Sequence, residues 1–306
     1  MLDVNNRPLV QFGPALQRGP DGPASGCLPF IILQAAIMST AIPQTWFPPR
    51  RGLLLFALWL GVAVYAQADD FRVDSRVYQG KDETPFAENL TIFRGGQIYD
   101  FQEQGSEITL YAPRLGRIIL LDKQRGVKAE ITPAQLEKFC VDLKLLAEKT
   151  TDPARKFLLT GQFENTPAPS AANAEGDADP VPQRVFQSPY ITYQVQTFTP
   201  RGQAIPAQYR EFSDLSAQLN ALLKRSWPPF ARMQVNAALA AEGTVPTKVT
   251  LLIPSQSFLG GKNLHYRSEH EYLNRLADSD QQRIAEAEEL VGSCRLVAVG
   301  EYLQKK

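Results

Sequence analysis

"ENLTIFRGGQIYDF", residues 88–101, holds two runs of strand-forming residues on either side of Gly95-Gly96. Glycine adopts positive φ at little cost, which the tight turn of a two-residue β-hairpin requires. Strands joined by short turns must pair antiparallel, because parallel neighbours need a long crossover. Four further strand-like runs surround the hairpin: "FRVDSRVY" (71–78), "SEITLYAP" (106–113), "GRIILLD" (116–122) and "VKAEI" (127–131). The first half of the chain therefore predicts a meander of six strands.

An amphipathic helix is predicted directly after this meander. Thr132 can cap it, Pro133 suits its first turn, and Gln135 completes a capping-box pattern. Apolar residues then recur with the helical period, at Leu136, Phe139, Cys140, Leu143, Leu146 and Ala147. This spacing gives one apolar face, which we expect to pack on the sheet.

The second half of the chain mixes strands and helices. The expected strands are residues 189–198, 248–254 and 262–273, with a short final strand in "RLVAV". The expected helices begin at Ser213, at Phe230 after the Pro228-Pro229 break, and at Ser279. The predicted fold class is α+β, with a curved antiparallel β-sheet (a meander) and amphipathic helices packed on one face.

Residues 161–184 interrupt this pattern. They are rich in proline, alanine and acidic residues and contain one aromatic residue, Phe163. Such a segment buries too little apolar surface to offset the entropy lost on ordering, so it predicts a disordered insertion. We favour a single α+β domain over residues 69–306, interrupted at 161–184. The alternative is two small domains, residues 69–160 and 185–306.

The stretch "PPRRGLLLFALWLGVAVYAQADD", residues 48–70, predicts export. Two arginines precede an apolar run over residues 53–65, and Ala66-Gln67-Ala68 offers the small residues at a signal peptidase site. A membrane span needs about 20 apolar residues, so this run is short for a permanent anchor. We therefore predict a signal peptide over residues 38–68, with cleavage marked by Ala66, Ala68 and Asp69. An uncleaved anchor is the alternative.

Residues 1–37 precede that signal and show no sustained periodicity. Because Met38 gives a signal of ordinary length, we predict that residues 1–37 are a non-native or disordered extension. The mature chain, 69–306, is then expected to be soluble and periplasmic or secreted. No second apolar run approaches the length of a membrane span.

The charge balance excludes one class of partner. The chain has 32 Lys and Arg against 32 Asp and Glu, so it lacks the basic excess that nucleic-acid binding requires. Its apolar fraction of 44% is that of an ordinary globular protein.

The two histidines, His265 and His270, lie close together around Glu269. Their spacing differs from that of zinc-peptidase helices, in which two histidines stand at i and i+4. In a strand, residues 265 and 270 point to opposite faces. A metal site at His265, Glu269 and His270 is therefore disfavoured, and we expect polar strand residues that are partly exposed.

Cys140 and Cys294 are the only cysteines after residue 68. Export permits a disulfide between them, and a buried free thiol at Cys140 is the equal alternative. We find no catalytic motif, no phosphate-binding loop and no cofactor motif.

The strands are rich in aromatic residues, which mostly predicts ordinary core packing. A curved sheet under helices can also keep an apolar cavity for a ligand. We therefore expect a non-enzymatic protein that binds a lipid, another apolar small molecule, or an envelope protein. The alternatives are an exported hydrolase with unrecognised acidic catalytic residues, and a structural envelope component.

The leader, the meander and the helix that follows resemble uncharacterised exported bacterial proteins. Over about residues 71–150 the pattern, including "LTIFRGGQIYDF" and "GRIILLD", is similar to LolA-like lipoprotein-carrier half-barrels. The resemblance implies a half-barrel that carries an apolar ligand. It assigns no site residues, and the helix that such carriers place before their first strand is missing here.

Overall fold

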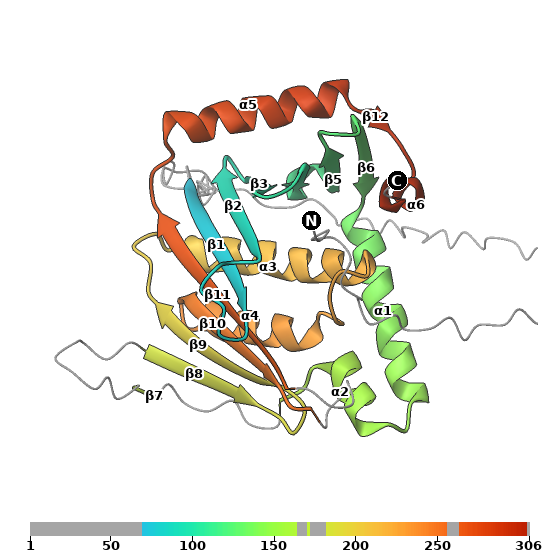
Figure 1. Cartoon of the computed structure of the whole chain (residues 1–306), viewed down its shortest axis with the longest axis vertical. Helices are drawn as coiled ribbons and strands as arrows, with labels where there is room; N and C mark the ends of the chain where they lie inside the picture. Colours follow the sequence, from blue (N-terminus) through green and yellow to red (C-terminus); the bar gives the residue numbers. More distant parts are fainter. Residues whose placement is uncertain (1–68, 164–169, 172–181, 256–262, 305–306) are drawn as a thin grey trace, which may run out of the picture. The chain divides into compact units, whose positions relative to one another are not determined.

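A computed structural model describes residues 69–163, 170–171, 182–255 and 263–304, which belong to one compact unit. Their strands form a single sheet of twelve, in the order β12-β6-β5-β4-β3-β2-β1-β11-β10-β9-β8-β7 (Figure 1). Every neighbouring pair is antiparallel except β12 and β6, which are parallel. The predicted α+β class with an antiparallel sheet is confirmed. The predicted signal peptide, residues 38–68, and the predicted extension, residues 1–37, lie outside the described residues.

The strands are β1 (Phe71–Gln79), β2 (Ala87–Arg94), β3 (Gln97–Gln102), β4 (Glu107–Ala112), β5 (Arg117–Asp122), β6 (Val127–Ile131), β7 (Ser170–Ala171), β8 (Pro182–Gln187), β9 (Thr192–Phe198), β10 (Val245–Ile253), β11 (Leu264–Leu273) and β12 (Arg295–Leu296). The α-helices are α1 (Pro133–Lys149), α2 (Pro153–Thr160), α3 (Ile205–Leu222), α4 (Phe230–Ala241), α5 (Asp278–Ser293) and α6 (Val299–Leu303).

The first six strands form the predicted meander, each paired with the next. Gly95 and Gly96 both adopt positive φ, 58° and 78°, in the turn between β2 and β3. The middle of the sheet is made differently. There β1 pairs with β11, for example Ser75 opposite His270, so strands from both halves of the chain share one sheet.

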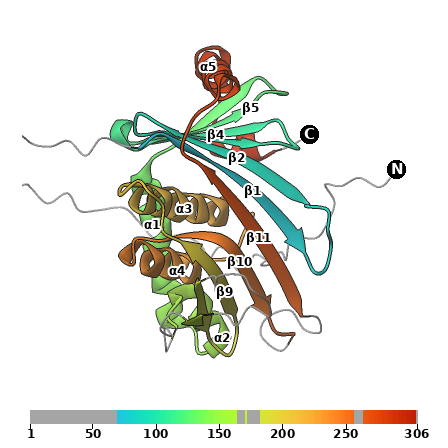
Figure 2. The ribbon, with the colours of Figure 1, turned by 90° about the vertical axis from the view of Figure 1, so that its left-hand side faces the viewer.

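Two apolar cores cover opposite faces of the meander. On one face, side chains of β1 to β6 pack against α3, and this core includes Phe93, Tyr111 and Leu219. On the other face, alternate residues of β2 to β5 pack against Ile284 and Ala287 of α5. Figure 2 shows α5 on the opposite side of these strands from α3 and α4. The prediction placed all the helices on one face, and α5 is the exception.

A third core lies where α2 and α4 pack on β8, β9 and β10. Phe163, near the start of the predicted insertion, and Phe186, just after its end, belong to this core. Arg184, at the other predicted boundary, is buried in β8 and forms an ion pair with Glu242. Phe163 and Arg184, near the two ends of the predicted insertion, are therefore buried, whereas residues 164–169 and 172–181 lie outside the described residues.

The helix boundaries follow local sequence in part. The capping box of Thr132 and Gln135 begins α1 as predicted, but Leu146 is 46% exposed rather than part of its buried face. Ser213 does not cap a helix: α3 begins earlier, at Ile205, and Ser213 is buried within it. Within the described residues, every helix is too short or too polar to cross a bilayer.

Candidate functional site

Polar side chains collect between α3, α4 and the middle of the sheet, where an apolar core would be expected. We call this group the α3–α4 seam. It comprises Ser75 of β1, Ser268 and His270 of β11, Tyr209 and Asp214 of α3, and Arg232 and Asn236 of α4.

His270 is the centre of the seam on the sheet side. Its Nδ1 lies 2.9 Å from the Ser75 hydroxyl and its Nε2 lies 3.1 Å from the Ser268 hydroxyl. Burial, the larger cause, and the positive charge of Arg232 together lower the pKa of His270 to about 3. The imidazole is therefore neutral at physiological pH, so one ring nitrogen donates a hydrogen bond to one serine and the other accepts a hydrogen bond from the second serine.

Tyr209 contributes the aromatic ring of α3 that packs on His270. Its ring makes edge contacts with His270 and with Tyr272, at centroid distances of 6.2 and 5.5 Å. Burial also raises the pKa of Tyr272 well above its ordinary value. Tyr272 therefore stays neutral, and the aromatic ring of Tyr209 packs between it and His270.

The helices meet through a second polar group. Asn236 of α4 donates a hydrogen bond of 2.8 Å to Asp214 of α3, and Arg210 lies 3.5 Å from the same carboxylate. Burial raises the pKa of Asp214, while Asn236 and Arg210 lower it. The Oδ1 atom of Asn236 is buried and has no hydrogen-bond donor among the described residues.

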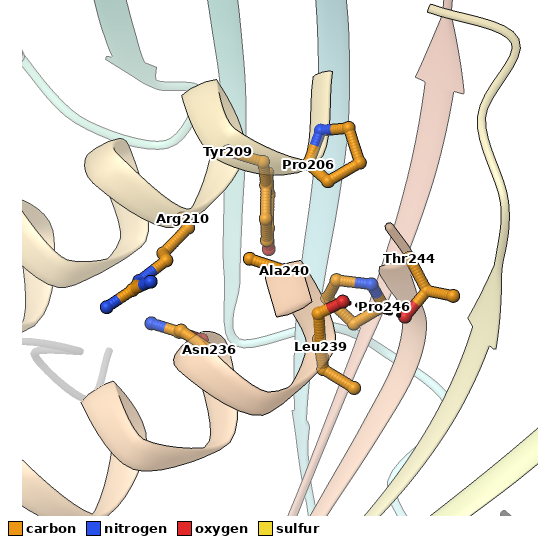
Figure 3. A pocket seen from close by; sticks show the side chains of 8 residues that line it. All are labelled: Pro206, Tyr209, Arg210, Asn236, Leu239, Ala240, Thr244 and Pro246. Carbon is orange, nitrogen blue, oxygen red and sulfur yellow. Dashed lines mark hydrogen bonds between the residues drawn. The ribbon is translucent and has the colours of Figure 1, made fainter. Parts of the chain in front are cut away.

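Two hollows adjoin the seam. The first is a void of about 10 Å³ beside Tyr209 and Asn236, drawn in Figure 3, where Arg210 and Asn236 extend into the same space. It is about large enough for one water molecule. The second, which we call the α3–α4 depression, is open to solvent and measures about 350 Å³. Its lining consists of Ala207, Arg210, Glu211, Asp214, Ala240 and Ala241.

Asp100 of β3 is a further titratable group with a perturbed environment. It accepts hydrogen bonds from the Thr91 hydroxyl at 2.8 Å and from the Asn89 amide at 3.2 Å. Burial raises the pKa of Asp100 to about 6, although both hydrogen bonds lower it. The same carboxylate raises the pKa of the buried Tyr111 hydroxyl, for which burial is the larger cause.

The residues considered from sequence are separated by the fold. His265 and Glu269 lie on one face of β11 and His270 on the other, as the odd spacing of the histidines predicted. All three residues are half-buried, as expected of partly exposed strand residues. Among the residues that the structure describes, no three metal-ligating side chains come together.

The structure describes both cysteines and one of the three residues of the predicted cleavage site. Cys140 on α1 and Cys294 at the end of α5 are free thiols, so the disulfide that their number permits is not formed in this structure. Burial raises the pKa of both thiols, which keeps them protonated. Ala66 and Ala68 lie outside the described residues, whereas Asp69 begins the described chain.

Sequence reasoning missed most of the seam. Ser75 and Ser268 look like ordinary strand residues, and Arg232 and Asn236 look like the solvated side of an alanine-rich helix. The usable signal was that Asn236 interrupts the run of apolar residues on α4, since polar residues within an apolar stripe need buried partners.

This geometry can hold protons and one water molecule in place, and His270 lines neither of the two hollows described here. Ser268, rather than a carboxylate, orients the imidazole, so the arrangement lacks the acidic member of a Ser-His-Asp triad. No protein-family model matches the sequence, and no curated protein matches it either.

Proposed function

We propose that the chain is an exported, non-enzymatic protein of the periplasm or the extracellular space that binds another envelope protein. The export step rests on the leader over residues 38–68 and the small residues before Asp69. The binding step rests on the α3–α4 depression.

The depression favours a partner that binds from outside. Its volume of about 350 Å³ lies within the range of ligand sites, and it is open to solvent. Alanines from both helices leave space for a partner side chain, and Arg210, Glu211 and Asp214 supply charges of both signs. The void beneath it, about 10 Å³, does not accommodate a lipid or another apolar small molecule. The geometry of the two hollows therefore supports a protein partner over a carried lipid.

The hydrolase alternative has weaker support. Glu211 and Asp214 both line the depression, and the raised pKa of Asp214 is a property that catalytic acids share. However, Asn236 and Arg210 already engage the Asp214 carboxylate, which fits a structural role. The resemblance to LolA-like carriers stays a prediction.

Site-specific cross-linking in the native cells tests the proposal. A photo-reactive residue at Ala207, on the rim of the depression, should capture a defined envelope protein, and Ala240→Arg should abolish that adduct by filling the hollow. The matched control is the same residue at Glu286, on the exposed side of α5. Equal capture from both positions, insensitive to Ala240→Arg, contradicts the proposal. Native mass spectrometry that finds a stoichiometric lipid on the purified protein supports a carrier instead.

A further inference from the structure

The first residues after the predicted cleavage site are built into the fold. The side-chain amide of Gln208, in α3, donates to the backbone oxygen of Asp69 at 3.4 Å. The backbone N–H of Gly95 donates to the Asp70 carboxylate at 2.9 Å. Phe71 is fully buried and stacks on Phe93 with ring centroids 4.0 Å apart. The start of β1 is therefore fixed from its first residue.

One polar atom at this point lacks a partner. The Oε1 atom of Gln208 is buried and receives no hydrogen bond from any of the described residues. A buried acceptor without a donor destabilises the folded state, so such atoms usually mark a missing donor. The nitrogen of the same amide contacts the Asp69 carbonyl, so the Gln208 side chain reaches the backbone of Asp69.

The turn before α3 is shaped around the same residue. A Cβ atom placed on Gly202 would lie 2.5 Å from the Asp69 carboxylate, so a larger residue at 202 would displace this side chain. The carboxylate thus lies near the amino end of α3 (Ile205–Leu222), where the helix dipole favours negative charge. A cation placed here would otherwise be disfavoured by that dipole, and the Asp69 carboxylate offsets this effect.

We propose that Gln208 and the Gly202 turn form a receptor for the α-ammonium group of Asp69, which processing releases. The inference rests on the proposed export and cleavage. Hydrolysis of the Ala68–Asp69 peptide bond consumes one water molecule and yields the Ala68 carboxylate and the Asp69 amine. That amine, with an ordinary pKa of about 8, takes up a proton at neutral pH. The ammonium then donates to Gln208 Oε1, which is a form of N-terminal amine capture.

This receptor makes processing a stabilising event. A charged donor forms a stronger hydrogen bond than the single amide N–H of the uncleaved chain. The chain that begins with a free amine at Asp69 should therefore be more stable than the same chain with its amine blocked.

The test compares three forms of the purified protein: one beginning at Asp69 with a free amine, one acetylated there, and one retaining Ala66-Gln67-Ala68. At pH 7 the free-amine form should melt about 5 °C higher than the other two, the shift expected for one charge-assisted hydrogen bond in a domain of this size. Gln208→Leu should remove the difference. Gln208→Glu should enlarge it and raise the pKa of the α-amine, measured by NMR titration.

Gln218→Leu, on the same helix but hydrogen-bonded to Met233 instead, is the matched control and should preserve the difference. Equal melting temperatures for the free and acetylated forms overturn the receptor, and this comparison requires no substitution. N-terminal sequencing of the protein from cells examines the export proposal separately. A start other than Asp69 would overturn processing at this bond, whatever the melting experiment shows.

Discussion

β5 and β9 belong to the same sheet, yet they differ in how many of their faces are buried. In β5, every residue from Ile118 to Asp122 is buried, because α3 and α5 cover opposite faces. In β9, buried Tyr193, Val195 and Thr197 alternate with half-exposed Thr192, Gln194 and Gln196. The covered face of β9 packs on α4, and its other face is polar. A strand that helices cover on both faces is therefore apolar at consecutive positions, whereas a strand covered on one face alternates apolar and polar residues.

The largest expected effect comes from the face that α5 covers. Leu121 of β5 is 0% exposed within that core, so Leu121→Ala should lower the free energy of unfolding by about 2–5 kcal/mol. Gln194→Ala, on the polar face of β9, should change it by less than about 0.5 kcal/mol. Urea denaturation of both variants measures the contrast. Similar losses of unfolding free energy in the two variants would show that α5 does not bury the face of the sheet on which it packs.

A smaller effect is expected at the start of α5. Asp280 is 1% exposed, pairs with Arg72 of β1 at 2.9 Å, and accepts a hydrogen bond from the backbone of Ala277. Asp280→Ala should lower stability by about 2–4 kcal/mol, because it leaves the Arg72 charge and the helix end without this partner. The exposed pair Lys138–Asp142 of α1 provides the control, and Asp142→Ala should cost less than about 0.5 kcal/mol. Chemical denaturation measures the stability of both variants. Equal losses of stability would contradict a stabilising role for the buried Asp280–Arg72 ion pair.

The smallest effect depends on pH. The folded protein holds the pKa of His270 at about 3, well below its ordinary 6.5, so the unfolded chain binds this proton more readily. The stability that His270 confers is therefore fully present above pH 6.5 and is lost as pH falls toward 3. Between pH 8 and pH 5, wild type should lose at most about 2 kcal/mol relative to His270→Gln.

Urea denaturation of both proteins at the two pH values measures this difference. Asp100, whose folded pKa is raised to about 6, changes stability in the opposite direction as it titrates. It is present in both proteins, so its contribution cancels. A difference between wild type and His270→Gln that does not vary with pH would contradict the lowered pKa of His270.

The fold was predictable where local chemistry determines it. The Gly95-Gly96 hairpin and the capping box of Thr132 and Gln135 were read from adjacent residues, and both are present. The position of α5 was not, because its apolar residues do not specify which face of the sheet they cover. The burial of Phe163 was not predicted, because a single aromatic residue in a proline-rich segment carries little signal. In the structure it packs in a core with residues distant in sequence.

The seam was harder to predict than the fold. It brings together four elements separated by up to about two hundred residues, and none of its members forms a motif with its neighbours in sequence. Only the opposite faces of His265 and His270 followed from spacing, since alternation along a strand is a local property. The leader over residues 38–68 was predicted from the order of its arginines, apolar run and small residues, and export stays a prediction.

The pairing of β1 with β11 has a consequence for assembly. The strand that begins the described chain is completed on one side by a strand that ends at Leu273, so the middle of the sheet joins residues almost two hundred positions apart. Contacts of such long range slow folding, because the intervening chain must first be brought together. During synthesis the meander can form early, but its union with the remaining strands has to wait until nearly the whole polypeptide exists.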